Sequence, residues 1–258
     1  MDRLLLKLVV TPVLISSASL AGRRWGETVS GWFIGLPLGS GPVCFFLALE
    51  QGSEFAAAAA RGCVAGTAAE SGFCLAYVWA ARRAGWPMSI ASGTVAFAAV
   101  AAALQVAAPP LALLAPLAYA ALLAGLALMP RLVGRAAPLP APPPWDLPAR
   151  MALATALVLA LTALGPLLGG RLSGLLATYP LFGAVLAGFA HRLSGPANAE
   201  RVLRGMLIGL FGNTGFFQVI GLTIAGAGIA VAFAVATALA LTVQGATLWL
   251  LRRPKLRR

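Results

Sequence analysis

The chain has 258 residues, of which 60% are hydrophobic and only 10% are charged. A soluble domain of this size needs more charged side chains to cover its surface, so the composition excludes an ordinary globular protein. The net charge of +12 comes from short basic clusters between apolar runs, a pattern that sets membrane orientation and does not indicate nucleic-acid binding.

Apolar runs of about 20 residues, the length that a helix needs to cross a bilayer, recur along the chain. The fold class they predict is an all-α integral membrane protein with about nine transmembrane helices. No polar stretch is long enough for a soluble domain. In chain order the expected helices are 4–21, 29–49, 55–80, 88–107, 111–129, 151–168, 172–190, 202–224 and 226–251.

Two of these assignments leave an alternative open. The segment 88–129 would be about twice the required length as one helix, and Pro109-Pro110 removes two backbone donors, so a tight hairpin is expected there. A single span is the alternative. The first segment, 4–21, is interpreted as a span, with a cleaved signal peptide as the alternative.

The distribution of charge predicts the orientation. With nine spans, all but four of the 19 basic residues fall on one side, which places the C-terminus in the cytoplasm and the N-terminus outside. The expected location is the bacterial cytoplasmic (inner) membrane. Six tryptophans at the same boundary are expected to be interfacial anchors. They are Trp25, Trp32, Trp79, Trp86, Trp145 and Trp249.

An ungapped offset of 143 residues superposes much of the first half on the second. We therefore expect a first four-helix repeat in 1–108, a connecting helix and Pro-rich cytoplasmic linker in 109–149, and a second repeat in 150–258. One span separates the repeats, so the second copy is inverted, as is common in secondary transporters. The alternative is a duplication that only enlarged the bundle. Coincident pairs are Ser30-Gly31 with Ser173-Gly174, Pro37-Leu38 with Pro180-Leu181, Arg61-Gly62 with Arg204-Gly205, and Gly72-Phe73 with Gly215-Phe216.

Proline and glycine interrupt the second span of each repeat. Such breaks release backbone groups at membrane depth, and paired breaks in two halves indicate a transporter site. A simple packing kink is the alternative. The expected broken-helix residues are Gly35, Pro37, Gly39, Ser40, Gly41 and Pro42 in the first repeat and Thr178, Tyr179 and Pro180 in the second.

Glu70 and Asn213 occupy equivalent positions in the third spans, nine residues beyond an Arg-Gly pair and about 13 Å deeper along a helix. A carboxylate near mid-bilayer is costly unless it is paired, protonated or bound to a cation. Glu70 is therefore the first candidate for proton or cation coupling, with Asn213, Thr214 and Gln218 as its polar partners. The alternative is a protonated glutamate that serves packing.

Arg61 and Arg204 are the charged candidates. Arg61 either receives an anionic substrate group or pairs with Glu54, whereas Arg204 is four residues from Glu200, which favours a structural ion pair. Three cysteines lie in apolar runs at no metal-ligand spacing and are expected to be small core residues. The chain contains no H-E-x-x-H, Gly-x-Ser-x-Gly or Walker motif, so we predict neither an enzyme nor a metal or cofactor.

The stretch 174–208 resembles the small GlpM-type bacterial inner-membrane proteins, and 31–62 resembles a diverged copy. The resemblance rests on Leu176-Ala177-Thr178-Tyr179-Pro180-Leu181-Phe182, on Ala190-His191 and on the Arg-rich stretch 199–205. It implies a fused, inverted duplication of a four-helix unit, and it implies no activity. The first copy has Ala48-Leu49 where the second has His191-Arg192.

The sequence as a whole predicts a secondary transporter with a midplane site between inverted repeats. Its partners would be the lipid bilayer, a small solute or lipid-linked substrate, with an anionic one as an option, and a proton or cation. A flippase or assembly partner in cell-envelope lipid or polysaccharide synthesis is one alternative, and a non-transporting membrane scaffold is another. The substrate and the oligomeric state are left open.

Overall fold

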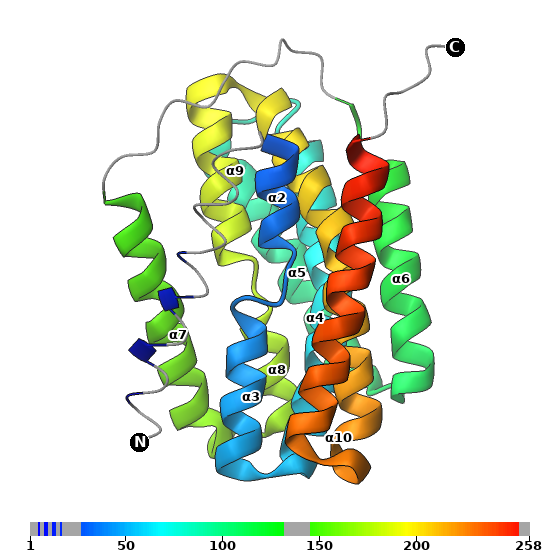
Figure 1. Ribbon diagram of the computed structural model, residues 1–258. Helices are drawn as coiled ribbons and strands as arrows, with labels where there is room; N and C mark the ends of the chain where they lie inside the picture. Colours follow the sequence, from blue (N-terminus) through cyan, green and yellow to red (C-terminus); the bar gives the residue numbers. More distant parts are fainter. Residues whose placement is uncertain are drawn as a thin grey trace.

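The computed structural model describes residues 27–131 and 145–252, and before them only positions 5, 8, 9, 12, 13 and 16. Within these residues the chain is helical and contains no strand (Figure 1). Five segments are long and apolar enough to cross a membrane, which confirms the prediction of a helical membrane protein. They are Trp86–Ala107, Leu111–Leu128, Leu147–Leu168, Gly170–Ser194 and Pro196–Trp249. Most of the expected first span, most of the Pro-rich linker and the basic tail lie outside the described residues.

The helices are arranged as an upright bundle (Figure 1). Pro109 and Pro110 lie between α5 and α6, so the expected hairpin is confirmed and the single long span is wrong. The described helices are α2 (Glu27–Ile34), α3 (Ser40–Gln51), α4 (Ser53–Ala80), α5 (Trp86–Ala107), α6 (Leu111–Leu128), α7 (Asp146–Leu168), α8 (Gly170–Ala177), α9 (Leu181–Ser194) and α10 (Pro196–Arg252).

Glycines make several of the connections between helices. Gly228 has φ 79° and ψ 169° inside α10, so it divides this element into a first arm before it and a second arm after it. Gly52, Gly169 and Gly195 have φ between 75° and 90° and ψ between 157° and 174°, and each joins two helices as a single residue. This backbone region is essentially restricted to glycine. The chain therefore reverses direction in almost no sequence.

α4 lies at the centre of the bundle, in contact with α3, α5, α6, α8 and α10. Although it is 28 residues long, it is not among the five most apolar segments, because it carries Glu54, Arg61 and Glu70. Other helices cover most of it, so it does not need a surface suited to lipid. Small side chains dominate its buried faces, which is the composition that lets membrane helices approach closely.

The packing of α4 on α8 is backbone against backbone. A side chain at Gly62 would collide with the carbonyl oxygen of Arg171, and one at Gly174 would collide with the carbonyl oxygen of Ala59. Dispersion between the two helices therefore depends on the absence of both Cβ atoms.

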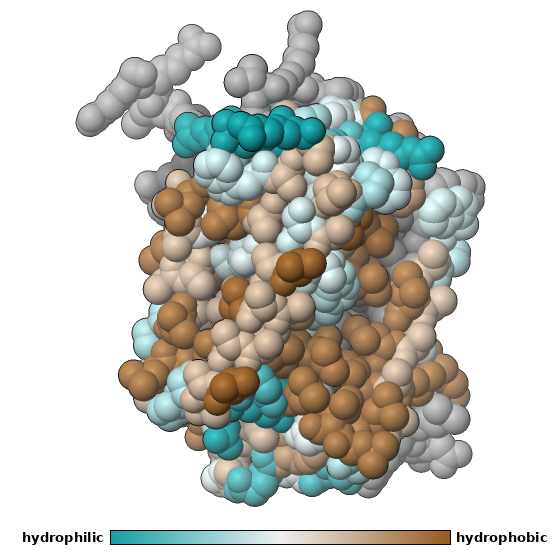
Figure 2. All heavy atoms as spheres, turned by 180° about the vertical axis from the view of Figure 1, so that it is seen from behind, coloured by the Kyte–Doolittle hydropathy of each residue, from teal (hydrophilic) through white to brown (hydrophobic). Residues whose placement is uncertain are grey.

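The surface has a broad apolar band between two more hydrophilic ends (Figure 2). Four tryptophans are exposed, as expected for interfacial anchors: Trp79, Trp86, Trp145 and Trp249. Trp32 is only 5% exposed, and its indole N–H donates to Thr247 Oγ1 at 3.0 Å. The prediction for Trp32 is wrong because α2 packs against α10, which covers this residue. All three cysteines are buried and free, as expected.

Candidate functional site

The second span of the first repeat is broken between Ile34 and Ser40. The N–H of Leu36 donates to the carbonyl of Phe33 at 3.2 Å, and the N–H of Leu38 donates to the carbonyl of Leu36 at 2.7 Å. The second of these bonds closes a three-residue γ-turn around Pro37. The helix then restarts.

The corresponding span of the second repeat is broken between Ala177 and Leu181. The N–H of Tyr179 donates to the carbonyl of Leu176 at 3.1 Å, and the N–H of Leu181 donates to the carbonyl of Tyr179 at 2.7 Å. Pro180 has φ −78° and ψ 54°, which is an inverse γ-turn. Each of the four atoms in these bonds lies 143 residues after its counterpart in the first break, since 179 − 36 = 143 and 181 − 38 = 143.

The first break is shorter than the sequence suggested. Ser40, Gly41 and Pro42 form the first turn of α3 and do not belong to the break. Proline is accepted in a first helical turn because the N–H groups there have no partner within the helix. Among the expected residues of the first repeat, Gly35, Pro37 and Gly39 lie in the break.

Each break packs against a glycine on the long helix of the other repeat. Gly35 lies against α10, where a Cβ built on it would be 2.7 Å from the Cα of Gly209. Thr178 lies against α4, where its Oγ1 occupies the space that a side chain at Gly66 would need. Position 209 again follows 66 by 143 residues, and 178 follows 35 by the same number.

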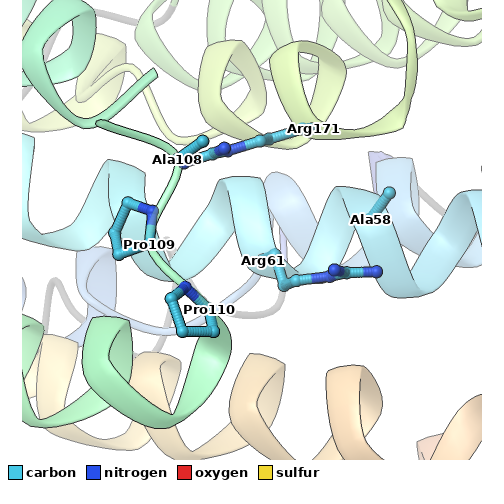
Figure 3. A pocket seen from close by; sticks show the side chains of 6 residues that line it. All are labelled: Ala58, Arg61, Ala108, Pro109, Pro110 and Arg171. Atoms are coloured by element: carbon cyan, nitrogen blue, oxygen red, sulfur yellow. The ribbon is translucent and has the colours of Figure 1, made fainter. Parts of the chain in front are cut away.

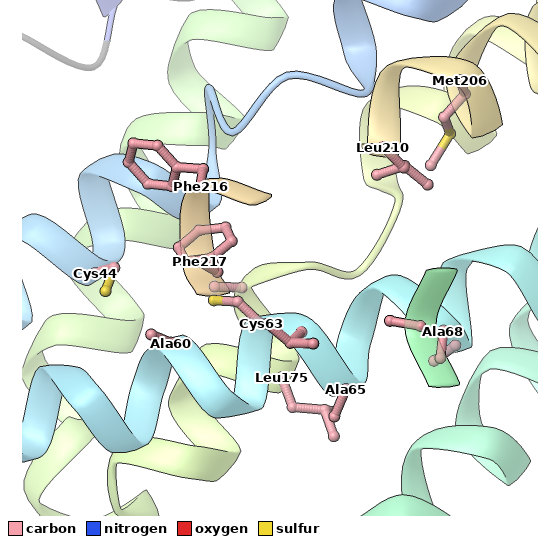
Figure 4. Packing of buried hydrophobic residues seen from close by; sticks show 14 of the residues in the cluster. Cys44, Ala60, Cys63, Ala65, Ala68, Leu175, Met206, Leu210, Phe216 and Phe217 are labelled. Atoms are coloured by element: carbon pink, nitrogen blue, oxygen red, sulfur yellow. The ribbon is translucent and has the colours of Figure 1, made fainter. Parts of the chain in front are cut away.

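The two breaks also approach one another. A methyl group added at Gly39 would lie 3.9 Å from Cε2 of Phe182, the residue 143 positions later. Figure 4 shows the two irregular segments crossing the core, with Cys63 and Ala68 of α4 below them and Leu210 and Phe217 of α10 beside them. The centre of the molecule is therefore the place where both helix breaks and both long helices meet.

Glu70 is buried on α4, 7% exposed, one turn beyond Gly66. Its Oε2 atom has no hydrogen-bond partner among the described residues. On the facing helix Asn213 is 3% exposed, and its side-chain amide donates to Thr67 Oγ1 at 3.1 Å. Thr67 in turn donates to the carbonyl of Cys63 at 3.1 Å. A carboxyl group therefore lies beside a saturated polar contact and is not itself satisfied by it.

The polar partners expected for Glu70 hydrogen-bond elsewhere. Thr214 donates to the carbonyl of Leu210 on its own helix at 2.9 Å, and Gln218 accepts the hydroxyl of Tyr119 on α6 at 3.5 Å. The prediction is wrong for these two residues because each residue turns a helix by about 100°, which directs them away from the face that carries Asn213. Asn213 itself bonds Thr67 and not Glu70.

The two arginine candidates have different surroundings. Arg204 pairs with Glu200 at 2.5 Å, as predicted, and also donates to the carbonyls of Leu126 and Met129 at 3.1 Å each, at the end of α6. Arg61 is exposed, and its Nε donates to the carbonyl of Ala57 at 3.4 Å.

No ion pair joins Arg61 to Glu54 among the described residues. The pairing alternative for Arg61 is therefore wrong. Glu54 lies two helical turns before it.

Three polar residues at these sites were not found by sequence reasoning. Thr67 is three residues before Glu70 and so shares its helix face, a spacing that was a usable signal. Gln244 is 2% exposed on the second arm of α10, and its amide donates to the carbonyl of Gly209 at 2.6 Å, beside the first break. Arg171 begins α8 near Arg61, and no local signal marked it.

His191, interpreted as a passive residue at the membrane boundary, lies 3.3 Å from the hydroxyl of Tyr77 through its Nδ1 atom. Comparison with known proteins found no matching family model, no matching curated protein and no matching solved structure. The resemblance to GlpM-type proteins therefore stays a prediction, and the function must be inferred from the geometry of this chain.

Proposed function

We propose that the protein is a secondary transporter of the bacterial cytoplasmic membrane. In this proposal nine spans form two inverted four-helix repeats around a connecting span, and the substrate site lies where the two breaks meet. The C-terminus is cytoplasmic, on the side with most of the basic residues.

The observation that carries the proposal is the matched pair of breaks. They share the same γ-turn around a proline, the same distance in sequence from a glycine contact on the opposite long helix, and a contact with one another. In Figure 1, α4 and the first arm of α10 run in opposite directions, as do α2–α3 and α8–α9. Opposite directions are expected of inverted copies, and a midplane site formed by interrupted helices is typical of secondary transporters.

The breaks supply the polar backbone that such a site needs. Each proline lacks an N–H, and each γ-turn uses only some of the local carbonyls. Within hydrocarbon these groups require protein or water as partners, so interrupted helices are tolerated where they line a cavity or a bound solute. The half-helices α3 and α9 begin at the two breaks and direct their positive ends toward the same region.

Glu70 supplies the coupling in this proposal. A buried carboxylate without a cationic partner is unfavourable, so the side chain takes up a proton or a cation when it is closed within the bundle. Alternate opening of the two sides would let it release that proton or cation. Asn213, at the equivalent position, would keep a neutral polar group in the pseudosymmetric half.

The test is the thermal stability of the purified protein as a function of pH and of sodium concentration, for wild type and Glu70→Gln. Because the amide mimics a protonated carboxyl group, we expect the variant to fold and to lose the pH or sodium response that the wild type shows. Glu54→Gln is the control, since Glu54 is an exposed acid on the same helix and should leave the response intact.

A wild type whose stability responds to neither pH nor sodium, together with an indistinguishable Glu70→Gln variant, would favour the membrane scaffold and defeat the coupling role. In proteoliposomes the same variant should abolish proton movement driven by an imposed gradient. Proton movement equal to that of wild type would equally rule out Glu70 as the coupling group.

A further inference from the structure

We propose that a second site, near the end of the bundle where α4 begins, binds an anionic group of phosphate type. The site is a pocket of about 350 Å³ (Figure 3). α4, α8 and the connection between α5 and α6 form it, and its lining residues are Ala58, Arg61, Ala108, Pro109, Pro110 and Arg171.

Two guanidinium groups line this pocket, and none of its lining residues is acidic. Arg171 donates through Nη2 to the carbonyl of Leu104 at 2.6 Å, which anchors it to the end of α5. Arg61 uses Nε for the carbonyl of Ala57. A guanidinium has five N–H donors, so both arginines keep donors for a ligand. Two like charges at one pocket repel each other, and an anion between them removes that repulsion.

Comparison with Arg204 shows that the missing anion is specific to Arg61. The residue one turn before Arg204 is Glu200, and the pair makes an ion pair at 2.5 Å. The residue one turn before Arg61 is Ala57, which offers only its carbonyl. Arg204 is neutralised within the protein, whereas among the described residues Arg61 makes no ion pair.

The rim of the pocket is stiff. Pro109 and Pro110 have restricted φ angles, and Ala108 adopts φ 46° and ψ 45°, a left-handed conformation that is uncommon for residues other than glycine. A preformed rim reduces the entropy lost when a ligand binds. Figure 3 shows Arg171 reaching toward Ala108 on this rim, while Arg61 extends along α4 toward Ala58.

The chemistry and size of the pocket favour phosphate. Several oxygens on a phosphate can accept bonds from two guanidinium groups at once, and arginine is well suited to this geometry. The volume is at the lower end for small-molecule sites, which fits a phosphate ion or the phosphate of a lipid head group. Binding here does not depend on transport or on Glu70.

The experiment measures binding to full-length protein purified in a neutral detergent. The probes are inorganic phosphate and water-soluble dihexanoyl phosphatidic acid, each titrated at constant ionic strength against chloride. The variant is Arg61→Gln, chosen because Arg61 is exposed and its loss should not prevent folding. The control is Arg83→Gln, which removes an exposed arginine just beyond the other end of the same helix.

We expect the wild type to bind at least one probe, with binding about 10-fold or more weaker in Arg61→Gln, from the loss of one charge-assisted hydrogen bond. Arg83→Gln should bind as the wild type does. Binding of inorganic phosphate would identify a free phosphate-type ligand, and binding of phosphatidic acid alone would identify a lipid head group. The proposal fails if neither probe binds better than chloride, if Arg61→Gln binds equally well, or if Arg83→Gln weakens binding as much. The Glu70 experiment is unaffected by any of these results.

Discussion

Replacement of Gly62 by alanine tests the backbone contact between α4 and α8. A Cβ at this position would lie 2.8 Å from the backbone nitrogen of Leu175 and 2.9 Å from the carbonyl carbon of Arg171, and closer still to the oxygen of that carbonyl. Ordinary contacts to a Cβ begin near 3.4 Å, so at least 0.6 Å of movement is needed at Leu175 (3.4 − 2.8 = 0.6). Backbone atoms cannot rotate away as a flexible side chain can, so the two helices must separate.

The expected cost follows from this separation. Overpacking of a tight core typically costs about 1–3 kcal/mol, and a gap of roughly 0.5–1 Å forfeits a quarter to a half of the dispersion energy of the atoms that line it. We take about 3 kcal/mol for the contact. Alanine regains about 1 kcal/mol over glycine in a helix. The net loss of unfolding free energy is therefore about 2 kcal/mol, or a melting temperature lower by roughly 4–8 °C.

The assay is thermal unfolding of the purified protein in detergent, with Gly245→Ala as the matched control. Gly245 is a helical glycine on α10 where an added Cβ meets nothing within 4 Å. This variant should be as stable as the wild type or more stable by up to about 1 kcal/mol. A Gly62→Ala protein that melts at or above the wild-type temperature would refute the backbone-to-backbone packing of α4 on α8.

Two further predictions concern residues outside the central site. Arg204→Gln should destabilise the protein by about 3 kcal/mol, because it leaves Glu200, which is 6% exposed, without its cation and two carbonyls of α6 without a donor. Denaturation by sodium dodecyl sulfate measures this, and a loss below about 1 kcal/mol would contradict a structural role. Gly228→Ala should cost about 1–3 kcal/mol because φ 79° with ψ 169° is strained for any residue with a side chain. Thermal melting next to Gly226→Ala, where an added Cβ meets nothing within 4 Å, isolates the effect, and equal melting temperatures would show that the turn tolerates a Cβ.

Local chemistry made some of the fold predictable. Pro109-Pro110 ended a helix where two missing donors required it, and Pro37 and Pro180 marked the two breaks. The limits of the first break were less predictable, because Pro42 is equally acceptable inside a first helical turn. The expected nine spans stay a prediction beyond the five apolar segments, since a central helix such as α4 is shielded by its neighbours and carries charge.

The candidate site was predictable only where one helix carried the signal. Glu70 and Asn213 were found from their depth and their equivalent positions, and both are buried. Gln218 was assigned to the same cluster, although its rotation around the helix brings it to Tyr119. Arg171 could not be found, because its pocket is made by three segments that only the tertiary fold brings together.

The single-glycine connections bear on how this chain enters a membrane. Between α3 and α4, between α7 and α8, and between the arms of α10, one glycine is the whole connection, and Figure 1 places all three turns at the same end of the bundle. Transfer of a hydrophilic loop across the bilayer is costly because each polar group must leave water. These helix pairs carry almost no such loop, so each can insert as a closed hairpin with both helices entering together. Synthesis in the membrane then requires little translocation of polar sequence at this end, and a protease or antibody that approaches from there meets few extended residues to grip.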